Sequence, residues 1–279
     1  MRLAVCVTTP EVPIVHPLAF FSGPFKEKIE RIAAAGAAGV ELMTIDPAAL
    51  DVYEIRRHVE ASGLEVSAVS SGAMSTGLGL TLLAERTEVR AAARLRFHDL
   101  LRFASEVGAP VVTVGSFRGK AAWAGGIEKA SRVFQETIME AATIAERLDV
   151  TIAIEPINGM DIDFITTYEE GVEFAQRIGR KNVGLLLDTY HVGLEKADSI
   201  TSFQRAALSG ILKHVHIADS DRLPPGEGSL DFVAIYDALL NGGYRGWLSA
   251  ELKPGSDPGS TISSIKKMLL RFEEERAAS

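Results

Sequence analysis

Three acidic residues and one histidine each stand at the end of a short apolar run in the second half of the chain. They are Glu155 in TIAIEPIN, Asp188 in VGLLLDTYH, His216 in HVHIADSDR and Glu251 in WLSAEL. Taken singly, a Glu or Asp in such a place is more often a helix cap or a surface charge. Three carboxylates held together would repel strongly unless a cation or shared protons offset their charge. If the four residues meet, they therefore predict a site for one divalent metal ion.

The ligand types narrow the choice of metal. Three carboxylates and one imidazole form an oxygen-dominated set, which suits Mn²⁺, Mg²⁺ or Co²⁺ better than an ion selected by thiolates. Zn²⁺ is not excluded, and Mn²⁺ is the ion we expect. The single Cys6 lies in the first apolar run and is expected to belong to the core.

A repeated pattern of elements must bring these residues together. A short run rich in Val, Ile and Leu, a loop and a longer amphipathic segment recur eight times. The predicted strands are 2–7, 38–43, 64–70, 110–115, 150–155, 183–188, 212–218 and 246–251. The predicted helices are 24–35, 51–62, 88–107, 127–148, 167–178, 198–208, 230–240 and 260–276. A repeat of about 35 residues is typical of a βα unit.

The alternation predicts an α/β fold, a (β/α)8 TIM barrel, formed by one domain over residues 1–279. No linker or shift in composition divides the chain. The alternative is an open doubly wound sheet, which usually carries a Gly-rich phosphate loop after its first strand. Here that strand leads into TTPEVPIVHP. In a barrel, the carboxyl ends of all strands meet at one rim, where catalytic residues lie.

Side-chain alternation agrees with this placement. Residues two apart share a face of a strand, so Glu155 shares its face with Ala153, and His216 shares its face with His214. The aliphatic residues between them would face the helices, while the sixth strand is apolar on both faces. The polar set is therefore expected to point into the barrel.

Composition excludes several classes of protein. The chain is 47% hydrophobic and 24% charged, as ordinary globular proteins are. Its formal charge of −8 argues against a nucleic-acid partner, which usually meets a basic face. There is no run of about 18 apolar residues, so no membrane span is expected. The apolar run at 3–7 is shorter than the core of a signal peptide, and a single cysteine forms no internal disulfide. We therefore expect a cytoplasmic protein. Whether it forms a homo-oligomer stays open.

With these residues in this order, the chain resembles the xylose isomerase-like TIM-barrel superfamily of sugar isomerases and epimerases. Within it, the chain is most similar to the ketose 3-epimerase and hydroxypyruvate-isomerase-like branches. The resemblance covers nearly the whole chain, through GVELM, EPIN, LLDTYH, HVHIADSDR with PPGEGSLDF, and GWLSAEL. It implies that Glu155, Asp188, His216 and Glu251 are the metal ligands.

The resemblance also implies roles in catalysis. Glu155 and Glu251 match the acid/base pair of the epimerases, which work on the two faces of the substrate. His191, Arg222 and Asn158 match positions that bind the substrate. As alternatives, His191 would be a structural loop histidine, and Arg222 would form a rim ion pair with Asp219 or Asp221.

One departure from the family pattern leaves the sugar open. Epimerases commonly continue E-x-x-N-R-x-E after the fifth strand. Here Glu155 and Asn158 match, but Gly159 replaces the arginine and Asp161 replaces the second glutamate. A different end of the sugar, or another reaction of the superfamily, would be consistent with this change.

Several other residues near the strand ends have two interpretations. Arg118 and Lys120 follow the fourth strand and would either bind a phosphate or be solvated. The GEG segment at 226–228 would either cradle a phosphate or form a turn before the next helix. His16, in the first loop, would either line the pocket or serve only the loop.

The expected function is a metal-dependent sugar isomerase or epimerase with a small sugar as its partner. A cation would stabilise an enediolate as a carboxylate removes the proton beside a carbonyl. A keto-inositol dehydratase is the main alternative, because it needs the same metal and enolate. An abasic-site endonuclease would require more histidines and a basic groove, and a non-catalytic sugar-binding barrel would keep the pocket without turnover.

Overall fold

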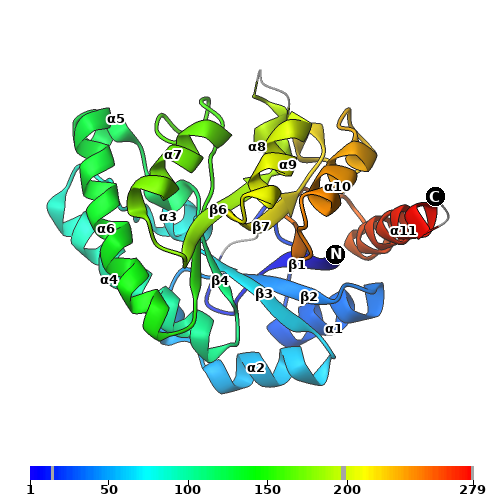
Figure 1. The fold of residues 1–279 in the computed structure, drawn as a ribbon. Coiled ribbons are helices and arrows are strands. Elements are labelled where there is room, and N and C mark those ends of the chain that lie inside the picture. Colours follow the sequence, from blue (N-terminus) through cyan, green and yellow to red (C-terminus); the bar gives the residue numbers. More distant parts are fainter. Residues whose placement is uncertain (14–15, 196–198, 278–279) are drawn as a thin grey trace.

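Eight parallel strands close into a barrel in the computed structural model, which describes residues 1–13, 16–195 and 199–277 (Figure 1). Each strand pairs with the next along the chain, and β8 pairs with β1. The strands are β1 (Arg2–Thr8), β2 (Gly39–Met43), β3 (Glu65–Ser70), β4 (Val111–Val114), β5 (Thr151–Ile154), β6 (Val183–Asp188), β7 (Leu212–Ile217) and β8 (Trp247–Ala250). The predicted (β/α)8 TIM-barrel fold is confirmed.

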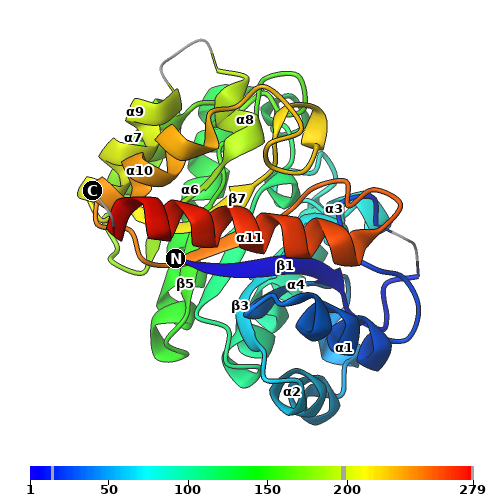
Figure 2. The same ribbon diagram turned by 90° about the vertical axis from the view of Figure 1, so that its right-hand side faces the viewer.

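The longer helices surround the barrel (Figure 1). They are α1 (Phe25–Ala35), α2 (Val52–Ala61), α4 (Thr87–Glu106), α6 (Ile127–Arg147), α7 (Tyr168–Ile178), α9 (Ser199–Leu208), α10 (Phe232–Asn241) and α11 (Pro258–Ala277). Each predicted helix is found within two residues of its expected ends, except that residue 198 lies outside the described residues. Helix α11 runs beside β1, where its Glu273 lies 3.4 Å from the N-terminal amine (Figure 2). Within the described ranges, no helix combines the length and apolarity needed to cross a membrane.

Short helical segments between the strands and the longer helices were not predicted. They are α3 (Gly72–Leu78), α5 (Ala121–Ala124), α8 (Thr189–Gly193) and the 3₁₀ turns Pro47–Ala49, Ser116–Arg118 and Ser220–Arg222. Segments of three to seven residues are too short to show a repeated apolar face. These segments matter because several of them carry residues of the site.

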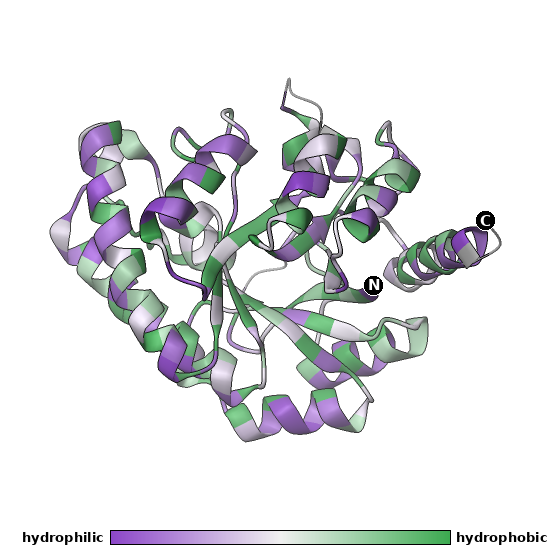
Figure 3. Ribbon diagram, viewed as in Figure 1, coloured by the Kyte–Doolittle hydropathy of each residue, from purple (hydrophilic) through white to green (hydrophobic). Residues whose placement is uncertain are grey.

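The core has an outer and an inner part, as the alternation along the strands predicts. Ile152 and Ile154 belong to the large apolar cluster between the barrel and the helices. Ala153 instead packs inside the barrel with Ala68, Val111 and Leu186. Figure 3 shows hydrophilic and hydrophobic residues alternating along the helices. The inward face of each strand is therefore free to carry polar groups at the rim.

Candidate metal centre

The four predicted ligands meet at the carboxyl end of the barrel. Asp188 is the last residue of β6 and lies opposite His216 in the register of β6 with β7. Glu155 and Glu251 were predicted inside strands but directly follow β5 and β8. One ligand atom from each of the four lies within 4.8 Å of those of the others. The predicted convergence therefore exists in the structure.

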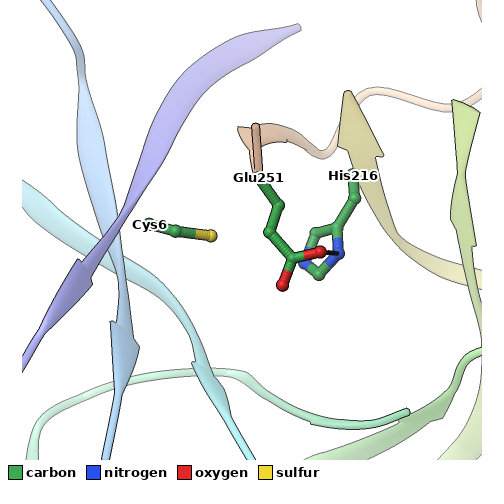
Figure 4. A group of neighbouring side chains, drawn as sticks. All are labelled: Cys6, His216 and Glu251. Atoms are coloured by element: carbon green, nitrogen blue, oxygen red, sulfur yellow. Dashed lines mark ion pairs between the residues drawn. The ribbon is translucent and has the colours of Figure 1, made fainter. Parts of the chain in front are cut away.

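The Nδ1 atom of His216 faces all three carboxylates. It lies 3.5 Å from Glu251 Oε2, 3.8 Å from Glu155 Oε1 and 4.0 Å from Asp188 Oδ2. Figure 4 shows the Glu251 carboxylate beside the imidazole ring. Among the described residues, the buried Nδ1 atom and Glu155 Oε1 have no hydrogen-bond partner. A cation bound by both atoms would satisfy these two buried polar groups.

Charge and ligand chemistry both fit a divalent cation. The three carboxylates carry three negative charges, and Arg222 provides one positive charge beside them. A divalent ion would neutralise the remaining two charges. Carboxylate oxygens with one imidazole nitrogen are a suitable donor set for Mn²⁺ or Mg²⁺.

Neighbouring charges shift the pKa values of two residues in the cluster, Glu251 and His216. Burial disfavours a charged Glu251, but His216 and Arg222 together lower the pKa of its carboxyl to about 2. Burial likewise disfavours a protonated His216, yet Glu41 and Glu251 raise the pKa of its imidazole well above the usual value. The cluster therefore attracts positive charge strongly, whether as a proton or as a metal ion.

Arg222 bridges the ligand cluster and the cavity. Its Nη1 atom forms an ion pair with Asp188 and lies 3.2 Å from Glu251 Oε2. Its Nη2 atom lies 2.9 Å from His191 Nε2. The alternative ion pair with Asp219 or Asp221 is not what the structure shows, because the acidic partners are Asp188 and Glu251.

The loop that holds Arg222 is built around a buried carboxylate. Asp219 accepts hydrogen bonds from the backbone N–H groups of Gly226, at 2.9 Å, and Leu230, at 3.0 Å. Asp221 and Arg222 adopt left-handed backbone conformations, with φ of 59° and 61°. The GEG segment therefore forms a turn, since the backbone N–H of its Gly226 donates to Asp219.

Asn158 and His191 form a hydrogen-bonded pair behind Arg222. Asn158 Nδ2 lies 2.8 Å from Asp161 Oδ2 and 2.8 Å from His191 Nδ1, while its Oδ1 accepts from Met160 N. The amide therefore donates to Nδ1, which leaves the ring proton on Nε2. His191 Nε2–H and Arg222 Nη2 are then two donors that lie 2.9 Å apart, and Glu155 Oε1 lies 3.8 Å from His191 Nε2. An oxygen of a ligand would satisfy both.

A cavity of about 290 Å³ opens over the cluster. Its wall includes the predicted His191 and Arg222, and also His16, for which the pocket interpretation holds. Asn158 is buried and is not among the lining residues, so we expect it to act through His191. Ser70, Thr113 and Ser116, which carry hydroxyl groups, also line the wall. A small polyhydroxy ligand would suit this lining.

Neither expectation for Arg118 is correct. The side chain is fully buried and donates to the backbone oxygens of Glu155, at 3.0 Å, and Ile165, at 3.2 Å. It supports the backbone under Glu155 and is neither solvated nor exposed to a phosphate. Nearby, Gly115 leaves the space that the Glu155 carboxylate occupies, because a Cβ at Gly115 would collide with it.

Glu41 and His214 were missed as parts of the site. Glu41 Oε2 lies 2.9 Å from His214 Nε2, and both oxygens of Glu41 lie 3.0 Å from His216 Nε2. A glutamate within the apolar strand GVELM was the available signal, because a buried charge needs partners. Polar residues on inward faces of other strands would have pointed to these partners.

Cys6 lies inside the barrel, as expected for a core residue. Its Sγ atom lies 3.8 Å from Ser249 Oγ and points toward Glu251 and His216 (Figure 4). Burial, followed by the charge of Glu41, raises the pKa of the thiol. A protonated thiol is a poor metal ligand, so the carboxylate set is the better site.

Known proteins show the same family and fold. Residues 29–271 match the family model described as "xylose isomerase-like TIM barrel". D-psicose 3-epimerase of Ruminiclostridium cellulolyticum is 35% identical over 133 residues, 48% of this chain and 44% of that protein. L-ribulose 3-epimerase of Mesorhizobium japonicum is 28% identical over 85% of this chain and 80% of that protein. The first relative is thus matched over less than half its length.

The fold similarity extends along the chain. The crystal structure of D-allulose 3-epimerase from Methylomonas sp. superposes with a TM-score of 0.80 at 19% identity, covering 98% of both chains. At this identity, the similarity concerns the fold alone.

Proposed function

The chain belongs to the xylose isomerase-like TIM-barrel family, and from this premise we propose that it is a metal-dependent sugar epimerase acting on a ketose by proton transfer. The observation that carries the proposal is the convergence of two glutamates, Glu155 and Glu251, with Asp188 and His216 beneath a polar cavity. Relatives named ketose 3-epimerases support a ketose as the small-molecule partner.

The residues that would hold the metal are Glu155, Asp188, His216 and Glu251. We propose Mn²⁺, with Mg²⁺, Co²⁺ or Zn²⁺ able to use the same donors. When bound, such an ion supplies Lewis-acid stabilisation of negative charge on neighbouring substrate oxygens.

Glu155 and Glu251 are proposed as the acid/base pair. They follow β5 and β8, so two strands separate them along the rim and they can address a substrate from different sides. One carboxylate removes the proton from the carbon beside the carbonyl, which leaves an enediolate. The other returns a proton to the opposite face of that carbon and inverts it. General-base catalysis of this kind contributes about 10²–10⁴-fold.

His191 and Arg222 are proposed to bind one substrate oxygen that lies beside both of them. Their Nε2 and Nη2 atoms lie 2.9 Å apart and both donate, so an oxygen that gains negative charge in the transition state would be stabilised by both. Asn158 contributes by holding the His191 ring. Asp161, which replaces the glutamate of the family pattern, also lines the cavity.

We further propose that residues 1–279 form one domain, since β8 closes on β1 and α11 pairs with the N-terminus. The cytoplasmic location, the absence of nucleic-acid and membrane partners, and the homo-oligomer stay predictions.

The test is turnover of a ketose panel in D₂O with Mn²⁺. Deuterium should enter the carbon beside the carbonyl, with inversion there. Glu155→Gln and Glu251→Gln should each lower turnover by at least about 10²–10⁴-fold, whereas Glu128→Gln, on the exposed face of α6, should not. Metal content is measured in the same samples.

Each other product pattern would point elsewhere. Deuterium on the neighbouring carbon with an aldose product would indicate aldose–ketose isomerisation, and loss of water would indicate a dehydratase. Product without solvent deuterium would argue for a hydride shift. Normal turnover in both Gln variants with metal retained would remove the two glutamates from acid/base catalysis.

A further inference from the structure

A buried carboxylate lies directly behind the histidine of the metal centre. Glu41 lies on β2, and its Oε2 atom is 2.9 Å from His214 Nε2. Both carboxylate oxygens of Glu41 lie 3.0 Å from His216 Nε2. The two histidines are two residues apart on β7, so both rings face the barrel interior. The side chains of all three residues are at most 2% exposed.

These contacts decide which nitrogen of His216 is available. A carboxylate accepts hydrogen bonds, so each imidazole presents an Nε2–H group to Glu41. In a neutral ring the other nitrogen then carries no proton. For His216 that nitrogen is Nδ1, the atom that lies 3.5 Å from Glu251 and 3.8 Å from Glu155. A histidine binds a metal through such an unprotonated nitrogen.

We propose that Glu41 is a positioning residue of the metal centre. By accepting from His216 Nε2–H, it holds the ring in the tautomer and orientation that aim Nδ1 at Glu155, Asp188 and Glu251. His214 donates to the same carboxylate, and the contact of Glu41 with His216 does not depend on it. The inference rests on the proposed metal site and adds a residue that touches neither the ion nor the substrate.

Glu41, His214 and His216 could in principle be a second cation site, since their ligand atoms also lie within 4.8 Å of one another. Two observations favour hydrogen bonds. The N–O separations of 2.9–3.0 Å are those of N–H···O bonds. Glu41 and His214 are not among the residues that line the cavity, whereas Glu155, His216 and Glu251 are.

The experiment compares Mn²⁺ binding by wild-type protein and three variants. Glu41→Leu removes the acceptor, and Glu41→Gln keeps one acceptor oxygen without the charge. His214→Phe is the matched control, because it removes a neighbour of Glu41 but leaves the bond to His216. The dissociation constant is measured on metal-free, folded protein. Electron spin-echo modulation then reports whether an imidazole nitrogen binds the Mn²⁺.

We expect Glu41→Leu to weaken Mn²⁺ binding by about 10–100-fold and to lose or diminish the nitrogen signal at saturation. Glu41→Gln should weaken binding less. His214→Phe should keep both the affinity and the signal, even where it lowers thermal stability. A purely structural role for Glu41 would lower stability and leave the nitrogen signal intact.

Three results would overturn the inference. The first is a folded Glu41→Leu variant that keeps the wild-type Mn²⁺ affinity and nitrogen signal. If that variant does not fold, the same result in Glu41→Gln counts instead. A second Mn²⁺ per chain that both Glu41→Leu and His214→Phe abolish would replace it with a second cation site. If the wild-type protein binds no Mn²⁺, the proposed function fails as well. Failure of the Glu41 inference alone is therefore distinguishable, because wild-type protein would then still bind Mn²⁺.

Discussion

The Nδ2 atom of Asn158 lies 2.8 Å from Nδ1 of His191, and this contact joins the loop after β5 to helix α8. The same amide nitrogen lies 2.8 Å from Asp161 Oδ2, so the two contacts together fix the orientation of the Asn158 amide. The contact places the ring proton of His191 on Nε2, which lies 2.9 Å from Arg222 Nη2 at the cavity wall. A residue off the cavity wall thus sets the donor that a substrate would meet.

Asn158→Ala should lower kcat/KM by about 5- to 150-fold, because it leaves a buried ring nitrogen without its partner. Metal affinity should stay unchanged, since neither residue belongs to the ligand set. The control is His191→Ala combined with Asn158→Ala. If Asn158 acts through His191, the double variant loses no more than His191→Ala alone. Additive losses would show an independent role.

Removal of the metal should destabilise the protein. Without a cation, three carboxylates face one another, and the positive charges of Arg222 and His216 offset them in part. Chelator treatment should lower the melting temperature, and Mn²⁺ at 100 times its Kd should add about 2.7 kcal/mol of stability. Asp188→Ala should abolish most of this gain. Differential scanning fluorimetry with metal analysis would refute the site if neither treatment moved the melting temperature.

Arg222→Ala should leave the metal in place and damage substrate handling. The guanidinium competes with a cation for Asp188 and Glu251, so its loss should make metal binding at least as tight. Activity should fall because a donor to the substrate oxygen is gone, with Arg222→Lys retaining more than Arg222→Ala. Paired measurements of Kd for Mn²⁺ and of kcat/KM check this. Loss of bound metal in Arg222→Ala would contradict it.

Gly115→Ala should misplace Glu155. The added methyl group collides with the Glu155 carboxylate, and a shift of about 1 Å at a catalytic group can cost about 10²-fold in rate. Gly72→Ala is the control within the same cavity, since its Cβ would meet Ser116 Oγ at 3.7 Å, an ordinary contact. We expect kcat to fall in the first variant only. Equal activities would show that Glu155 moves without consequence.

A pH effect on stability should come from Glu195, which accepts a hydrogen bond from Tyr168 N at 3.2 Å. Burial, against that hydrogen bond, raises the pKa of its carboxyl from 4.5 to about 7. Between these values the folded protein binds more protons than the unfolded chain, so the free energy of unfolding falls as pH rises. Glu195→Gln should be more stable than wild type at pH 8 and similar at pH 4. Urea titrations across this pH range measure the free energy of unfolding of both proteins. The same pH dependence in wild type and Glu195→Gln would contradict the prediction.

The alternation of apolar runs and amphipathic segments was enough to predict the barrel, because helices and parallel strands bury their faces with different periods. The same alternation gave the direction of side chains at the strand ends. Since all strands of a barrel end at one rim, Glu155, Asp188, His216 and Glu251 could be grouped before any distance was known. The resemblance then added His191 and Arg222, and both line the cavity.

What the sequence by itself determined is the order of the elements and the four residues that meet at the rim, since both follow from local periodicity and from a rule of the fold. The tertiary structure alone decided the partners: Glu41 behind His216, Asn158 behind His191, and Arg118 buried under Glu155. These contacts join residues 33 to 175 positions apart, and local periodicity does not show which distant side chains meet. A side chain such as Arg118 has the same chemistry whether solvated or buried, and only the packing around it settles which state it takes.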